Sequence, residues 1–376
     1  MSWRKALAAA SPCGIQDVLG HIKSGKEILI GFTGPKIPQE EVVRQIAVGY
    51  ECWNLGKLKC GEFISAAQDR IPPMNANVGR NYRAERAADS PFGIDDETYQ
   101  RCSWGLLLPD NVPSSLGYSF GDVLFVLNLY SPRFLRPMFY LSDFGIQRPE
   151  RDEDYRLFFH DQNQAERFSQ EQFVTFYQSL VGESVYGSWQ ADRMAKWDAE
   201  DWRLFVASLL FTELRHGEHS KQVFTWQREA ADMTTILEAL FTAKDGDTLE
   251  VGYRLRKRIA VLLSSWFPKI ERDVKELYTQ RSSFVHGAFF QDAKKRIKVR
   301  DGMAQLPSPP FAFLYQRKEE IRHALAVYLH LNRLRRNGAR GFEGYPSVLD
   351  ILEKSVVDLD IRARVHSGAE EIMRLM

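Results

Sequence analysis

The chain has 376 residues, of which 44% are hydrophobic and 26% are charged, and its formal net charge is +1. These values exclude a largely disordered chain, and no apolar run approaches the roughly 18–20 residues that span a bilayer. Four cysteines without a Cys-x-x-Cys pair make no disulfide framework, and the apolar stretch of about six residues near the N-terminus is too short for a signal peptide. We therefore predict a cytoplasmic protein that does not enter a membrane.

Charge is unevenly distributed along the chain. Residues 251–340 contain 20 Lys and Arg against 7 Asp and Glu, a net charge of +13, whereas residues 1–250 carry −9 and residues 341–376 carry −3. A basic block of this size predicts a surface for a polyanion such as RNA. The alternative is that the basic side chains are solvated on helix faces or dock on the acidic remainder of the chain.

Residues 1–195 predict a mixed α/β region. The apolar run at 27–33 is typical of a buried strand, and Pro38 predicts the start of a helix that carries Val43. Residues 61–100 are rich in polar residues, Gly and Pro and indicate a long loop. Further strands are expected at 106–108, 122–129 and 138–141, followed by a helix at about 168–181.

Residues 196–340 predict a helical bundle, because apolar residues recur at helical spacing through one segment after another. The expected helices cover 202–214, 224–243, 249–266, 268–286 and 315–336, and residues 341–376 are expected to form a short helical tail. The fold class expected for the whole chain is therefore α+β, with an N-terminal mixed α/β region and a C-terminal all-α bundle. The N-terminal region is expected to act as a sensor or regulatory domain.

Two histidines, His216 and His219, lie one helical turn apart and could bind a metal as a pair. No third ligand can be identified, however, and Gly217 between them weakens a helix. We therefore predict no metal and no cofactor.

The motif that carries chemistry lies near the end of the segment 268–286. Arg281 is followed by Ser282 and, five positions after itself, by His286. Arg281 continues an apolar stripe, so that a full charge points toward an apolar interface, which is costly unless it meets an anion or a partner dipole. One interpretation is catalytic; the other is a capped helix end, in which Arg281 pairs with an acid such as Glu238 and His286 interacts with the last carbonyls.

A second Arg and His at similar spacing, Arg317 and His323, lies in the last long helix. About two such matches are expected by chance in a chain of this composition. The spacing alone is therefore weak support for a function. Whether such a pair is a functional motif must be judged from the residues around it.

Those surroundings resemble a known family. The segments 237–241, 253–263, 277–287 and 320–325 are similar, in order and spacing, to the Apea-like branch of the HEPN superfamily, whose third helix carries Leu-Tyr-x-x-Arg-Ser-x-x-Val-His-Gly. The resemblance covers about residues 200–340. It implies a helical bundle that forms a homodimer and brings two Arg-x(4–6)-His motifs into one cleft. Many such proteins are metal-independent endoribonucleases that serve as toxins or in defence against phage.

The resemblance also implies roles for individual residues. Arg281 and His286 match the two named positions of the motif, Ser282 occupies the position where many of the nucleases have Asn, Asp or His, and Glu238 lies where an acidic residue often occurs in an earlier helix. RNA supplies its own nucleophile, the 2′-hydroxyl. A histidine can carry the proton near neutral pH, and an arginine presents a charged fork to the phosphate oxygens.

Basic residues near the motif are expected to hold the RNA. They are Arg254 and Arg258, one turn apart on the preceding helix, and Lys294, Lys295 and Arg296 beyond the His. The predicted function is a HEPN-type endoribonuclease whose N-terminal region receives a protein or phage-derived trigger. The alternatives are a HEPN module without catalysis that binds nucleic acid or nucleotide, and a protein-interaction subunit whose acidic half masks its basic half.

Overall fold

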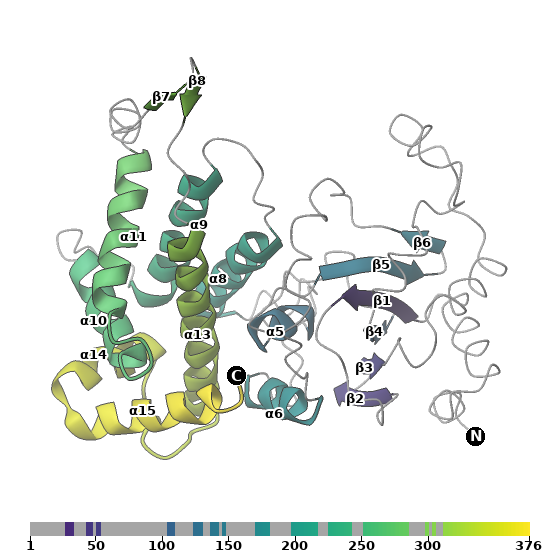
Figure 1. Cartoon of the computed structure of the whole chain (residues 1–376). Helices are drawn as coiled ribbons and strands as arrows, with labels where there is room; N and C mark the ends of the chain where they lie inside the picture. The colour runs from purple at the N-terminus through teal and green to yellow at the C-terminus, as the bar shows by residue number, and fades with distance from the viewer. Residues whose placement is uncertain are drawn as a thin grey trace. The chain divides into compact units, whose positions relative to one another are not determined.

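The computed structural model describes residues in two compact units (Figure 1). One unit comprises Met1–Leu116 and Arg133–Thr175, and the other comprises Gly117–Pro132 and Phe176–Met376. The domain boundary expected at 195 therefore falls inside the second unit. The described residues are 27–33, 43–47, 50–53, 104–109, 123–130, 136–142, 145–147, 170–180, 197–216, 225–242, 251–285, 298–300, 303–305 and 311–376.

The described strands of the first unit form one antiparallel sheet. Its order is β2-β3-β4-β1-β5-β6, and every described pair of neighbouring strands is antiparallel. At its centre the apolar strand β1 pairs with β4 on one side and with β5 on the other, where the register shifts between Gly31 and Phe32. The strands are β1 (Glu27–Thr33), β2 (Val43–Ala47), β3 (Tyr50–Trp53), β4 (Trp104–Pro109), β5 (Arg136–Ser142) and β6 (Gly145–Gln147).

The predicted α+β class with an N-terminal mixed α/β region is wrong. Most of the described part of the chain is helical, and the described N-terminal strands pair antiparallel with their neighbours. The one helix described between two of these strands is α5 (Val123–Tyr130), which belongs to the second unit. No α/β layer is thus built from the N-terminal residues that the structure describes.

Two N-terminal elements were predicted with the wrong type of structure. The apolar run 122–129, expected as a strand, forms α5, and the segment expected as a helix after Pro38 contains the strand β2. A short run that is apolar throughout fits a buried helix as well as a buried strand, because neither face is polar. Residues 125–130 of α5 are all buried, which explains the lack of any polar face in their sequence.

The second unit is a helical bundle, and the helices expected between 202 and 336 are confirmed apart from their ends. Residues 298–300 and 303–305 add a small hairpin, β7–β8. The bounds of the helices and hairpin strands are α6 (Gln170–Leu180, which begins in the first unit), α8 (Ala199–His216), α9 (Thr225–Phe241), α10 (Val251–Leu263), α11 (Ile270–Val285), β7 (Lys298–Arg300), β8 (Met303–Gln305), α13 (Phe311–Arg336), α14 (Val348–Val357) and α15 (Leu359–Met373).

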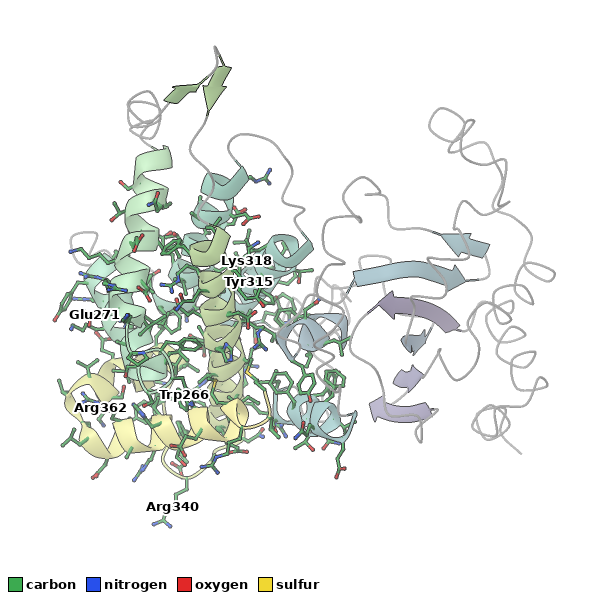
Figure 2. All side chains as sticks on the ribbon, viewed as in Figure 1. Trp266, Glu271, Tyr315, Lys318, Arg340 and Arg362 are labelled. Carbon is green, nitrogen blue, oxygen red and sulfur yellow. The ribbon has the colours of Figure 1, made fainter. Side chains whose placement is uncertain are left out.

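The core of the bundle forms around α13. Consecutive residues of this helix from Ala324 to Leu329 are buried, so that α13 is covered on all sides there. Figure 2 shows the side chains of the neighbouring helices filling the space around it. Tyr328 meets the ring of Phe241 from α9 edge-on at 5.7 Å between centroids.

Residues 341–376 are part of this core. The inward faces of α14 and α15 are buried at Ile351, Leu352, Val365 and Ile372. At Gly368 a Cβ atom would lie only 3.0 Å from the Leu331 side chain, so the absence of a side chain lets α15 approach α13 closely. The predicted helical tail is thus an integral layer of the bundle.

Buried arginines satisfy the carbonyls at the ends of two helices. Arg322 Nη1 donates to the carbonyls of Leu129 at 2.6 Å and Tyr130 at 3.2 Å, at the end of α5. Arg258 Nη1 donates to the carbonyl of Phe241, at the end of α9, at 2.6 Å. The last carbonyls of a helix lack partners within the helix, so these contacts stabilise both helix ends and hold α5 and α9 in place.

Candidate active site

The candidate site lies in the second half of α11. The negative charges of Glu271 and Asp273 in its first turn interact favourably with the positive end of the helix dipole. Ile270, Val274 and Leu277 are buried on the inward face of this helix. The apolar stripe that Arg281 continues is therefore used for packing inside the chain.

Arg281 follows this stripe and meets an acidic side chain of α9. Its Nη1 lies 3.5 Å from Glu238 Oε1, with 34% of the Arg281 side chain and 24% of the Glu238 side chain exposed. The guanidinium also lies 5.8 Å from the centre of the Tyr278 ring, and the Tyr278 hydroxyl donates a hydrogen bond to Glu238. We call these three residues, Arg281, Glu238 and Tyr278, the Arg281 cluster.

Tyr278 serves the cluster as a donor. Burial raises the pKa of Tyr278 well above its ordinary value, and the hydrogen bond to Glu238 and the negative charge of Glu238 raise it further. The phenol therefore keeps its proton and continues to donate to the carboxylate. The hydrogen bond from Tyr278 on α11 thereby holds the Glu238 carboxylate in place. The negative charge of this carboxylate in turn attracts and orients the Arg281 guanidinium.

The geometry of the cluster suits the binding of an anion. A guanidinium has five N–H donors in a plane, and one carboxylate at 3.5 Å engages only part of that fork. A third of the Arg281 side chain is open to solvent, so a phosphate group could approach it. The contacts with Glu238 and Tyr278 would hold the fork in one orientation as it does so.

Only part of the remaining predicted site lies within the residues that the structure describes. Ser282 is exposed next to Arg281, and Arg254 is half-buried on α10. His286, Lys294, Lys295 and Arg296 lie outside the described residues, so their predicted roles stay predictions.

Arg258, expected as an RNA contact, is buried in the bundle. Besides its bond to the carbonyl of Phe241, its Nη2 lies 3.3 Å from Glu353 Oε2 on α14, and only 5% of its side chain is exposed. A buried guanidinium that binds a helix end and the exposed Glu353 carboxylate does not face a ligand in solution. We therefore leave Arg258 out of the proposed RNA-binding surface.

Tyr278 is the member of the Arg281 cluster that the sequence motif does not predict. Its ring continues the helical spacing of the apolar residues Val274 and Leu277, a pattern that indicates packing alone. A buried tyrosine nevertheless usually finds a partner for its hydroxyl. Its position three residues before Arg281, on the same face of the helix, was the available signal.

The second Arg and His pair has a structural role. The Arg317 guanidinium is buried and lies 2.8 Å from Asp273 and 2.7 Å from Glu320. His323 donates from Nδ1 to the Glu319 carbonyl at 2.7 Å. Burial, together with the charge of Arg322, lowers the pKa of His323 to about 4, so this imidazole is neutral near pH 7.

Neither a membrane span nor a metal cluster occurs in the described part of the chain. None of its helices is both long and apolar enough to cross a bilayer. Groups of three or more His, Cys, Asp or Glu side chains that could hold a metal ion are also absent from the described residues. The side chains of His216 and His219 fall outside that part.

Comparison of the chain with protein-family models, with curated proteins and with solved structures gives no match. A function must therefore be argued from the residues of the Arg281 cluster and their surroundings.

Proposed function

We propose that the chain is a metal-independent endoribonuclease of the HEPN type, with Arg281 and His286 as its catalytic residues. The observation that carries the proposal is the Arg281 cluster: a partly exposed guanidinium in the second half of α11, held 3.5 Å from Glu238 of α9. The sequence resemblance independently expects an acidic residue at the position of Glu238 in the earlier helix. His286, the proposed proton carrier, follows Arg281 by five positions in the sequence.

The proposed reaction uses the 2′-hydroxyl of RNA. A base removes its proton, the 2′-oxygen bonds to the adjacent phosphorus, and the bond from phosphorus to the 5′-oxygen breaks as that oxygen receives a proton. Arg281 stabilises the negative charge of the phosphorane. His286 transfers protons, and a second copy of His286 from a second chain would supply the other proton carrier. As a toxin or anti-phage effector, the protein would respond to a trigger through its N-terminal unit.

The proposal predicts RNA cleavage in the presence of EDTA. Purified full-length protein in excess over end-labelled RNA should produce fragments that end in a 2′,3′-cyclic phosphate. RNA with a 2′-deoxy substitution at the cut site should stay intact there, because the nucleophile is missing. Binding of RNA without cleavage would support the alternative of a HEPN module without catalysis, and cleavage that requires magnesium would contradict the proposed chemistry.

The proposal also includes a homodimer, which would bring two copies of Arg281 and His286 to one phosphate. Because the apolar stripe of α11 is buried within the chain, the dimer must use other surfaces of the bundle. We expect light scattering to give the mass of two chains under conditions in which RNA is cleaved. A fully active monomer would show that one chain supplies both proton carriers.

A further inference from the structure

The outward face of α10 combines an exposed aromatic ring with basic side chains. Leu255, Ile259 and Leu262 are buried, whereas Tyr253 is 53% exposed. Arg256 and Lys257 lie three and four residues beyond Tyr253 and thus on the same face of the helix. We call Tyr253, Arg254, Arg256 and Lys257 the α10 face, with Arg254 at its edge.

Contacts within this face place positive charge next to the ring. Lys257 Nζ lies 5.5 Å from the centre of the Tyr253 ring and 3.0 Å from Glu271 Oε1. The Lys257 and Glu271 side chains are 38% and 40% exposed, so solvent screens their attraction and exchange of Glu271 for another anion costs little. Arg256 donates from Nε to the Gly252 carbonyl at 3.0 Å, which uses one of its five N–H groups.

We propose that the α10 face binds single-stranded RNA, with a base stacked on Tyr253 and the flanking phosphates bound by Arg256 and Lys257. The inference rests on the proposed function in taking RNA as the substrate. Exposed aromatic rings beside basic side chains bind single strands because every unpaired base presents a flat face and every nucleotide a phosphate. In a duplex the bases are stacked on one another, so their flat faces are not accessible to Tyr253. An acidic peptide could bind the basic side chains, but it would make no use of the exposed ring.

The register of α10 and α11 places this face and Arg281 at similar heights along the two helices. The chain turns between the two helices, and Lys257 pairs with Glu271 across them. Arg281 lies about 15 Å beyond Glu271 along α11, and Tyr253 lies about 6 Å from Lys257 in the same direction along α10. The axial offset between Tyr253 and Arg281 is therefore about 9 Å. A single strand stacked on Tyr253 could reach Arg281 with a nearby phosphate.

The test measures binding apart from cleavage. Full-length protein is titrated into a fluorescent oligouridylate whose 2′-positions are methylated and therefore cannot react, and binding is followed by anisotropy. Tyr253→Ala should weaken binding by about 5–150-fold through the loss of one stacked base, whereas Tyr253→Phe should bind like the wild type. Tyr315→Ala is the matched control, because Tyr315 is 59% exposed on α13 (Figure 2) and should not change binding.

A second arm tests the charges. Lys257→Gln should reduce the dependence of binding on salt by about one phosphate contact. Arg340→Gln is its control, since Arg340 is exposed in the loop before α14 and extends away from the bundle (Figure 2). An oligomer of the same length without bases should bind the wild type and Tyr253→Ala equally weakly, because only a base can stack.

The outcomes separate this inference from the proposed function. Wild-type affinity in Tyr253→Ala, or equal affinity of the wild type for strands with and without bases, would overturn the α10 face even if the protein cleaves RNA. Tyr253-dependent binding without cleavage of reactive RNA would support the α10 face and overturn the nuclease.

Discussion

Replacement of His286 with alanine is expected to slow RNA cleavage by about 10²–10⁴-fold, because one proton transfer loses its carrier. Arg281→Ala should cost at least as much, since stabilisation of developing charge is often the larger contribution. Arg281→Lys should restore only part of the rate, because an ammonium group cannot form the two parallel bonds of the guanidinium fork. The measurement is the single-turnover rate on labelled RNA in EDTA.

Folding must be controlled in these variants, because Arg281 could simply cap its helix. The Arg281 and Glu238 side chains are both partly exposed, and such a pair contributes only about 0–1 kcal/mol. Arg281→Ala should therefore unfold near the wild-type temperature. Thr279→Ala is the matched control, since this exposed residue of α11 donates its hydroxyl to the Lys275 carbonyl of its own helix and should retain full activity. A folded His286→Ala protein with the wild-type rate would remove this site from the reaction.

The pairing of Arg281 with Glu238 could be predicted from the sequence because both residues have strong local context. Helical spacing places Arg281 after the buried residues Val274 and Leu277, where a charge needs a partner. The capped-end interpretation named Glu238, and the ion pair is present. The hydrogen bond of the Tyr278 hydroxyl could not be predicted. Helical spacing indicates on which face of the helix the ring lies, but not which group the hydroxyl contacts.

Arg258 shows why the rest could not be predicted. It lies one turn from Arg254, and charged residues are usually found at the surface. Its partners are the carbonyl of Phe241 and the carboxylate of Glu353. Glu353 lies on α14, which is distant from Arg258 in the sequence. Only the tertiary arrangement compensates the buried charge. In the same way, the run that forms α5 became a helix because the bundle surrounds it on all sides.

Replacement of Asp273 with alanine is expected to lower the free energy of unfolding by about 3–5 kcal/mol, because it removes one of the two carboxylates that compensate the buried charge of Arg317. Arg317 is 2% exposed, and its Nη1 lies 2.8 Å from Asp273 Oδ2. Its other partner is Glu320 at 2.7 Å, but burial raises the pKa of Glu320 to about 7. A fraction of the molecules therefore carry a protonated Glu320 at neutral pH, which makes Asp273 the more constant counter-ion. Urea unfolding followed by far-ultraviolet circular dichroism measures the loss.

The neighbouring residue provides the control for this prediction. Arg272 contacts the same Asp273 carboxylate at 3.3 Å, but its side chain is 68% exposed, so Arg272→Ala should cost only about 0–1 kcal/mol. In the double variant Asp273→Ala/Arg317→Met the buried charge is gone and Glu320 can take up a proton, so most of the lost stability should return. If Asp273→Ala costs no more than Arg272→Ala, or if the double variant is less stable than Asp273→Ala, then Arg317 does not depend on Asp273 for compensation of its charge.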